Sequence, residues 1–374
     1  MTEWKTYKLG DILNFRRGHD LPKTQMVDGK IPVAGSNGII GYHNVSTPIE
    51  PCITIGRSGN VGTPYFYDRC WAHNTVLYID DFKGNDPLYL YYLLKTIPLA
   101  SYGGGSAVPT LNRNHIHPIE IKHTPSLEEQ RRIAGILGAI DDKIENNRRI
   151  NTSLELQAQA LFNNLMSNSN LEYKLIADID HIIETGRRPK GGVANITSGV
   201  PSIGAENIKG LGKYDYSKTK YITAEFAETL KKGIIKGYEL LIYKDGGKPG
   251  YFIPNFSIFG EGFPYDNMTL NEHVFLLDFG NKGYNFFAYF YMQTEEVMKY
   301  LNAQGSKAAI PGINRNDVEN ISIPTIENEA VKEFCERIEP IITSILVNSK
   351  ESSRLATLRD TLLPKLMNGE IKTE

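Results

Sequence analysis

The chain has 374 residues, with 41 Lys and Arg against 43 Asp and Glu, and a formal net charge of −2 at pH 7. This length predicts two or three domains, each able to form its own core. The near-neutral charge excludes a protein that binds nucleic acid through bulk positive charge. A nucleic-acid surface would have to be local, or shared with a more basic partner.

The cysteines and the apolar segments bear on the compartment. Cys52, Cys70 and Cys335 show neither metal-ligand nor disulfide spacing, which favours a reducing compartment. The start of the chain has no apolar signal region, and no apolar run reaches membrane-spanning length. We therefore expect a cytoplasmic protein.

Residues 1–125 form the first predicted domain. Short β-branched and aromatic runs bounded by Gly, Pro and Asn, such as residues 76–79, predict strands with a few helices packed on them. Glycine-rich loops follow at residues 35–38, 56–62 and 103–106. The segment therefore predicts a mixed α/β domain.

Residues 126–169 form a predicted long helix. Apolar and polar residues recur there at alternating steps of four and three, which is the a/d seam of a coiled coil. A helix of about 40 residues is roughly 60 Å long, so a narrow seam needs a long partner rather than a compact core. The seam residues are Ile133, Leu137, Ile140, Ile144, Asn147, Asn151, Leu154, Ala158, Leu161 and Leu165.

Residues 170–325 repeat the order of motifs in the first domain, and residues 326–374 repeat the long helix. Asn147 and Asn348 take the same seam position in the two helices, and buried polar residues of this kind can fix the register of a coiled coil. The chain is therefore predicted to be an internal duplication. The seam residues of the second helix are Phe334, Ile338, Ile341, Ile345, Asn348, Ser352, Leu355, Arg359, Leu362 and Leu366.

Catalytic and metal-binding motifs are not evident. Residues 56–63 contain glycines but lack the Gly-Lys-Ser/Thr ending of a P-loop, and no Asn/Asp-Pro-Pro-aromatic tetrapeptide of an amino methyltransferase occurs. Glu120 and Lys122 have the spacing of many nucleases, but the repeat places Ser322 opposite Glu120. The eight histidines match no zinc pattern. We therefore expect no catalysis, cofactor or metal in this chain alone.

The loops carry side chains suited to reading DNA. Arg can bond bidentately to guanine and Asn to adenine, while glycines let the backbone approach phosphate. Corresponding loop positions carry polar or charged residues in both domains, but the residues differ. For example, Arg57-Ser58 in the first domain corresponds to Lys244-Asp245 in the second. The candidate DNA-binding residues are Arg16, Arg17, Ser36, Asn37, Arg57, Ser58, Asn60, Ser106 and Arg113 in the first domain, and Arg187, Arg188, Lys190, Asn207, Lys244, Lys248, Ser306, Lys307 and Arg315 in the second.

These residues resemble a known family. Residues 31–42, 55–62, 125–134 and 361–371 are similar to the specificity subunit of type I restriction-modification systems. The Pro-x-Leu-Glu-Glu-Gln block at the start of the first long helix is the strongest of these motifs. The order domain, helix, domain, helix covers the whole chain and is the most specific feature of the resemblance.

The resemblance implies an α+β fold in which two similar target recognition domains are separated by two long antiparallel coiled-coil helices with an internal pseudo-twofold repeat. Each domain would read one half of a bipartite, asymmetric site in double-stranded DNA. The helices would act as a spacer and would dock two methyltransferase subunits, which bind S-adenosylmethionine and methylate adenine at N6. Endonuclease/translocase subunits that use ATP and Mg would complete the enzyme, and this chain would be non-catalytic.

The second long helix departs from the family pattern. Val331 falls where Gln130 lies in the first helix, and Pro340 lies within the seam region, where a kink is expected. Both raise the question whether the two helices engage methyltransferases equivalently. Alternative interpretations are the specificity subunit of a related type II system, a coiled-coil scaffold that binds other proteins, and a duplicated nuclease or methyltransferase with unrecognised motifs.

Overall fold

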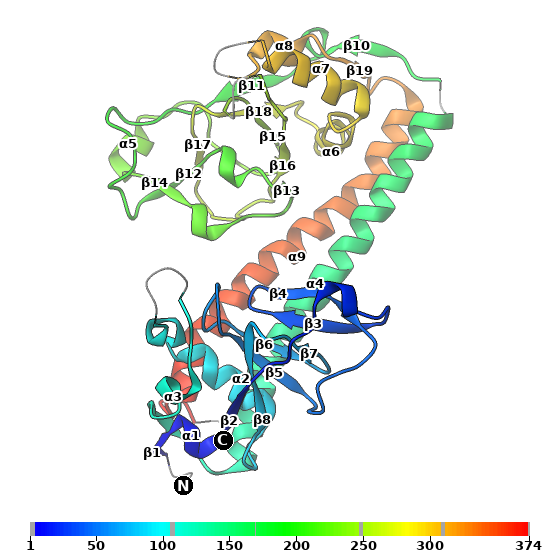
Figure 1. Ribbon diagram of the computed structural model, residues 1–374. Helices are drawn as coiled ribbons and strands as arrows, with labels where there is room; N and C mark the ends of the chain where they lie inside the picture. The colour runs from blue at the N-terminus through cyan, green and yellow to red at the C-terminus, as the bar shows by residue number, and fades with distance from the viewer. Residues whose placement is uncertain (1–3, 105–108, 169, 247–249, 308–310, 373–374) are drawn as a thin grey trace. The chain divides into compact units, whose positions relative to one another are not determined.

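The computed structural model describes residues 4–104, 109–168, 170–246, 250–307 and 311–372 (Figure 1). The chain folds into two compact units, called unit 1 (residues 1–143 and 355–374) and unit 2 (residues 144–354). Helix α4 (Leu127–Asn168) and helix α9 (Glu329–Met367) each contribute residues to both units. The predicted α+β class with two long helices is confirmed. The predicted domain boundaries, drawn at the ends of the long helices, stay a prediction.

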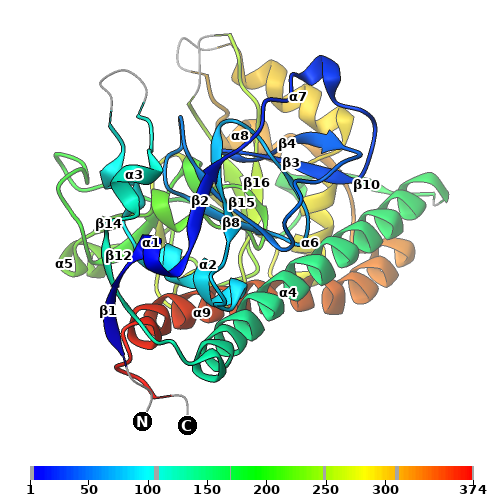
Figure 2. The ribbon, with the colours of Figure 1, turned by 60° about the horizontal axis from the view of Figure 1, so that its bottom comes forward.

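The described residues of unit 1 form three sheets and several short helices. The largest sheet is antiparallel, in the order β2-β8-β5-β6, and Figure 2 shows β2 and β8 side by side. A smaller sheet in the order β4-β3-β7 is mixed, because β3 and β7 run parallel. The strands are β1 (Lys5–Lys8), β2 (Asn14–Arg17), β3 (Ile31–Gly35), β4 (Gly38–His43), β5 (Cys52–Gly56), β6 (Pro64–Tyr67), β7 (Trp71–Ala72), β8 (Val76–Asp81) and β9 (Glu120–His123), and the helices are α1 (Leu9–Ile12), α2 (Pro87–Thr96) and α3 (Arg113–Ile116).

Unit 2 repeats this plan with one extra strand. Its largest sheet has the order β11-β18-β15-β16-β13, its second sheet has the order β14-β12-β17, and β10 pairs with β19. The strands are β10 (Tyr173–Leu175), β11 (Ile182–Thr185), β12 (Val200–Ile203), β13 (Gly210–Leu211), β14 (Lys220–Ile222), β15 (Leu240–Tyr243), β16 (Phe256–Ile258), β17 (Thr269–Leu270), β18 (Val274–Asp278) and β19 (Ser322–Pro324). The helices are α5 (Ala224–Glu228), α6 (Lys282–Tyr291), α7 (Glu295–Gly305) and α8 (Arg315–Glu319).

The two units share one topology, which confirms the predicted internal repeat. The sheet orders match apart from the additional strand β13 in unit 2, and the β1–β9 pair corresponds to the β10–β19 pair. The aromatic helices α2 and α6 also begin alike, because the Asp86 and Asn281 side chains accept from the Tyr89 and Tyr284 backbone N–H groups. The repeat therefore extends to individual helix caps.

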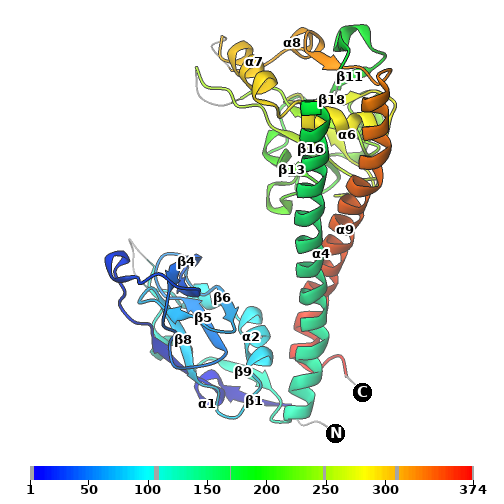
Figure 3. The same cartoon turned by 90° about the vertical axis from the view of Figure 1, so that its right-hand side faces the viewer.

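Helices α4 and α9 run side by side in opposite directions (Figure 3). Within unit 2, Asn147 bonds to Ser352, Asn151 bonds to Ser349, and the Phe162 and Phe334 rings pack edge to face. As residue numbers rise along α4, those of the partner fall along α9, so the predicted coiled coil is antiparallel. Helix α9 is assigned as one continuous helix through the exposed Pro340.

The seam residues lie along the faces that pack together. The buried members are Ile133, Leu137, Asn147, Ala158, Leu165, Phe334, Ile338, Ile345 and Leu366, and the half-buried members are Ile140, Ile144, Asn151, Leu154, Leu161, Ile341, Asn348, Ser352, Leu355, Arg359 and Leu362. The middle of the seam is polar, since Asn348 Nδ2 donates to Asn151 Oδ1 at 2.9 Å. Among the described residues, no helix combines the length and apolar character needed to cross a membrane.

Candidate nucleic-acid interface

A basic pocket opens on unit 1 beside the end of strand β2. It has a volume of about 390 Å³ and combines residues from β2, from the loop after β5 and from the segment that leads into α3. Four of the predicted DNA-binding residues meet here, although they are up to 97 residues apart in sequence. The lining residues are Arg16, Arg17, Arg57, Leu77, Thr110, Leu111, Asn112 and Arg113.

The tight loop after β5 positions Arg57. A Cβ at Gly56 would lie 1.8 Å from the Asn60 carbonyl oxygen, so only glycine fits this approach. The Arg57 N–H donates to Thr75 O, and the Arg57 carbonyl accepts from the Leu111 N–H, both at 2.8 Å. The backbone of Arg57 is therefore fixed on both sides, which leaves its side chain to act from a rigid base.

Arg113 and His117 both bind the backbone of strand β2 at Phe15. An Arg113 guanidinium nitrogen donates to the Phe15 carbonyl at 3.1 Å, and His117 Nε2 accepts from the Phe15 N–H at 3.1 Å. Burial and the neighbouring Arg113 and Lys83 charges lower the pKa of His117, which keeps Nε2 unprotonated and able to accept. The edge strand β2 is thereby tied to the segment that carries Arg113.

The remaining unit 1 candidates lie near the same loop. A Cβ at Gly59 would lie 3.6 Å from Ser36 Oγ, so the turn between β3 and β4 adjoins the loop after β5. Asn37 in that turn is exposed, and Asn60 accepts from the Thr63 hydroxyl at 3.3 Å while remaining exposed. Ser58 forms a bridge with Thr110. Ser106 lies outside the described residues.

Unit 2 carries an ion-pair network at the equivalent loop. The Lys244 N–H donates to His273 O and the Lys244 carbonyl accepts from Ile313, as Arg57 does with Thr75 and Leu111. The Lys244 ammonium pairs with Asp245 at 2.9 Å, and His273 Nδ1 also contacts Asp245. Burial alone would raise the pKa of Asp245, but the hydrogen bonds from Lys244 and His273 outweigh it and lower the pKa.

The same network includes Arg188 and Glu272. Arg188 pairs with the Glu272 carboxylate and donates toward His273 Nε2 at 2.9 Å. Burial alone would raise the pKa of Glu272, but the hydrogen bond from Arg188 outweighs it and lowers the pKa. Two of the predicted DNA-binding cations, Arg188 and Lys244, are therefore neutralised within the protein.

The other unit 2 candidates are scattered over this unit. Arg187 is exposed at a pocket of about 520 Å³, and Lys190 is exposed nearby in sequence. Arg315 pairs with Glu319 at 2.8 Å, and Lys307 donates to Gln304 at 2.6 Å. Ser306 has a buried hydroxyl oxygen that lacks a partner among the described residues, and Lys248 lies outside them.

One sequence expectation for unit 2 is corrected by the structure. Asn207 is fully buried, and its side-chain oxygen accepts from the Gly204 N–H at 3.0 Å, so it closes a local turn instead of facing a ligand. The two pairs of adjacent arginines among the candidate DNA-binding residues also lie at different positions relative to the neighbouring glycine. Arg16 and Arg17 precede Gly18 on strand β2, whereas Arg187 and Arg188 follow Gly186 beyond the end of β11. The two arginine pairs therefore occupy different places.

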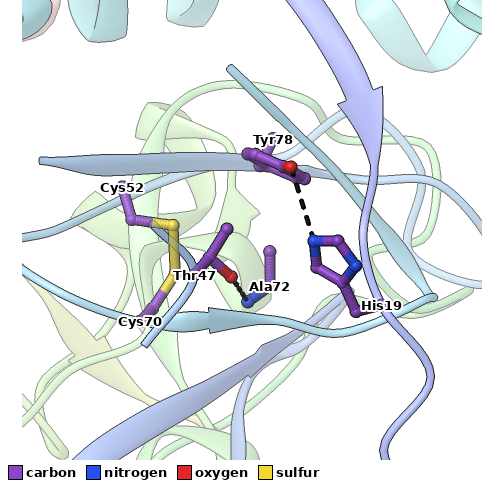
Figure 4. The surroundings of a disulfide bond; sticks show 6 residues. All are labelled: His19, Thr47, Cys52, Cys70, Ala72 and Tyr78. Carbon is purple, nitrogen blue, oxygen red and sulfur yellow. Dashed lines mark hydrogen bonds between the residues drawn. A yellow bond between two sulfur atoms is a disulfide. The ribbon is translucent and has the colours of Figure 1, made fainter. Parts of the chain in front are cut away.

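The cysteine expectation was also wrong. Cys52 and Cys70 form a disulfide 18 residues apart in unit 1 (Figure 4). Cys52 begins β5 and Cys70 directly precedes β7, and the hairpin of β5 and β6 returns the chain so that the two Cα atoms lie 5.9 Å apart. Spacing in sequence gives no sign of this approach. Cys335 is a buried free thiol.

The glutamine of the helix-opening motif has an internal role that sequence reasoning missed. Gln130 is fully buried, and its Nε2 donates to Asn85 Oδ1 and Thr124 O, both at 2.8 Å. Its Oε1 accepts from the Asp86 N–H at 2.8 Å. This amide joins the start of α4 to the start of α2, so it does not face a partner. The matching Val331 lies in an apolar core.

Comparison with known proteins shows which proteins this chain resembles. The model of the type I restriction modification DNA specificity domain matches residues 1–156. A type I restriction enzyme specificity subunit of Methanocaldococcus jannaschii is 27% identical over 307 residues, which cover 76% of this chain and 69% of that protein. Residues 1–156 thus match the DNA specificity domain of type I restriction-modification systems, and most of the chain is similar to their specificity subunits.

Two further similarities to specificity subunits extend along nearly the whole chain. A putative type I specificity subunit of Mycoplasma pneumoniae is 23% identical over 98% of this chain and 96% of that protein. The crystal structure of the S subunit from M. genitalium has a TM-score of 0.67 at 16% identity and covers 98% of this chain and 96% of that chain. The fold of a specificity subunit is thus shared from end to end.

Proposed function

We propose that this specificity subunit reads a bipartite, asymmetric site in double-stranded DNA, with each unit acting as the target recognition domain for one half-site. The loops at the ends of β5 and β15 and the turns beside them supply the reading side chains. In unit 1 these include Asn37, Ser58 and Asn60, and in unit 2 they include Arg187 and Asp245. Amide, hydroxyl, guanidinium and carboxylate groups are the side-chain groups that recognise base edges.

One observation carries this proposal: a shared backbone frame presents different chemistry in the two units. Arg57 and Lys244 make equivalent backbone hydrogen bonds, and Ser58 and Asp245 form equivalent bridges, to Thr110 and Gly312. Loops that share the same backbone hydrogen bonds but carry different side chains fit two domains that read two different DNA sequences. A scaffold with no ligand to discriminate gives no reason for this pattern.

The long helices fit a spacer and docking role. Their packed faces form the coiled coil, yet apolar side chains also remain on the outside. On the unit 2 portions, Leu156 of α4 is 68% exposed and Val347 of α9 is 58% exposed. Exposed apolar side chains on a helix are suited to burial against a protein partner. We assign these outer faces to two methyltransferase subunits, with endonuclease/translocase subunits joining the assembly.

The chemistry then belongs to the partner subunits. S-adenosylmethionine would bind to the methyltransferases, and ATP and Mg would serve the endonuclease/translocase subunits, while this chain supplies recognition. The net charge of −2 fits this division, because phosphate neutralisation drives much of DNA affinity and would be shared with the partners. The chain alone is expected to bind DNA weakly at physiological salt.

The test is to co-express this chain with its companion methyltransferase in a host without DNA methylation and to map N6-methyladenine by direct single-molecule sequencing. The expected result is a split motif with two different short half-sites and a fixed unspecified gap. A soluble co-purifying complex that leaves the genome unmethylated would contradict the proposal and favour a protein-binding scaffold.

A further inference from the structure

The unit 1 pocket carries charge of one sign. Its lining contains four arginines and no carboxylate. Among the residues that the structure describes, the arginines of unit 1 that form ion pairs are Arg69, Arg132 and Arg359, none of which lines the pocket. Arginines that line one pocket of about 390 Å³ repel one another unless an anion joins them.

The lining residues do not supply that anion. Arg113 bonds to a neutral backbone carbonyl of Phe15, and the Asp80 carboxylate, which accepts from Asn14 Nδ2 at 2.6 Å, is not among the lining residues. The backbone of Arg57 is already bonded on both sides. The charged groups of the lining residues are therefore all guanidinium groups, which match the oxygens of a phosphate.

Unit 2 provides an internal comparison. Gly56 pairs with Val76 and Arg17 with Leu77, while Tyr243 pairs with Val274 and Thr185 with Phe275. This register places four residues of unit 2 where the four arginines lie in unit 1. The corresponding residues are Glu184 for Arg16, Thr185 for Arg17, Lys244 for Arg57 and Arg315 for Arg113.

The equivalent place in unit 2 is nearly neutralised. Lys244 pairs with Asp245, Arg315 pairs with Glu319, and Glu184 accepts from the Gly233 N–H at 2.9 Å. The four positions therefore carry one net positive charge in unit 2 against four in unit 1, and both unit 2 cations already have carboxylate partners. The two units differ in electrostatics while sharing one backbone frame.

We propose that the arginine pocket of unit 1 binds a phosphodiester group of the DNA backbone, and that the matching place in unit 2 does not. This inference rests on the proposed DNA-recognition function. A guanine edge offers two acceptors, O6 and N7, which one guanidinium saturates. A phosphodiester is charged and accepts from several guanidinium groups at once. A pocket whose charged lining residues are all arginines fits the phosphate and not the base. Unit 1 thus anchors the subunit on DNA, beside the side chains that read the sequence.

The test measures DNA binding by the complex of this chain with its methyltransferase, on a duplex carrying the methylated motif and on a scrambled duplex, between about 50 and 200 mM salt. Arg57→Gln is expected to weaken both duplexes by the same factor, about fivefold at about 150 mM salt, and to lower the salt slope by about 0.9. The matched controls, Lys244→Gln and Arg315→Gln in unit 2, are expected to leave the slope close to that of the wild type.

Two further arms separate a phosphate contact from base reading. Arg57→Lys keeps the charge and is expected to retain the slope, whereas bidentate reading of guanine would be lost. A neutral methylphosphonate at the contacted position is expected to weaken the wild type but to add nothing to Arg57→Gln. If Arg57→Gln relaxes specificity at a guanine and leaves the salt slope unchanged, the inference is overturned. A normal split methylation motif in Arg57→Gln would leave the proposed function intact.

Discussion

Gln130 gives the sharpest test of how unit 1 is held to helix α4. Its buried amide makes three hydrogen bonds of 2.8 Å, to Asn85, Asp86 and Thr124. Gln130→Met keeps the length and the helix propensity of the side chain but removes all three bonds. Each lost bond leaves a partly or fully buried partner unsatisfied, at a cost of about 1 kcal/mol or more, so the sum is about 3 kcal/mol.

Asp86 caps helix α2, which makes this loss measurable locally. The Asp86 side chain accepts from the Tyr89 N–H at 2.9 Å, and its own backbone N–H is held by Gln130. Hydrogen exchange of the peptide covering α2 should therefore speed up about a hundredfold, since 1.4 kcal/mol is a factor of about ten. Mass spectrometry reads this peptide separately, so the measurement does not require the whole chain to unfold in one step.

The matched control is the next residue along the helix. Arg131 is exposed, and Arg131→Met should change the free energy of opening of the α2 peptide, measured by hydrogen exchange, by less than about 0.5 kcal/mol. If Gln130→Met accelerates exchange no more than Arg131→Met does, the amide is not the link between α2 and α4. A loss of methyltransferase binding with unchanged exchange would instead show that Gln130 contacts the partner.

The remaining predictions concern the seam, the core and a reading loop. Asn147→Ala should destabilise the unit 2 portion of the helix pair by about 2 kcal/mol, because its Nδ2 donates to Glu351 at 2.7 Å and to Ser352 at 3.3 Å, while the exposed Asn146→Ala should leave helix hydrogen exchange unchanged. Burial lowers the pKa of His123 to about 4, below its unfolded value near 6.5, so unit 1 should lose up to about 3 kcal/mol as pH falls from 6.5 to 4 and lose nothing above that range. A wild-type pH dependence of Tm in His123→Gln would contradict this. Asn37→Ala should change one half of the methylated motif only, and changes in both halves on the sequencing map would refute the assignment of one half-site to each unit.

The long helices and the duplication follow from local patterns, which is why the sequence predicts them. A 3.5-residue repeat places Ile133 and Leu137 on one face of any helix, whatever surrounds it. The order of motifs in residues 1–125 and 170–325 shows the repeat without any contact being known. Even the polar positions of the seam, Asn147 and Asn348, are visible as interruptions of an apolar pattern.

The chemistry of the loops depends on distant residues, so the sequence cannot assign it. Arg188 looks like a free cation until the fold brings Glu272, 84 residues away, into an ion pair with it. Arg57 looks much like Lys244, but Arg57 lines a pocket whose charged residues are all arginines, whereas Lys244 belongs to an ion-pair network.

By itself, the sequence determined two similar α/β domains, two long helices with a shared seam, and the resemblance to specificity subunits, because these are encoded in periodicity and motif order. Only the tertiary structure decided which loop residues are buried, as for Asn207, which cysteines meet, and which cations remain unpaired by carboxylates. The physical reason is that charge state and exposure are set by neighbours in space, and strand pairing chooses those neighbours from positions far apart in the chain.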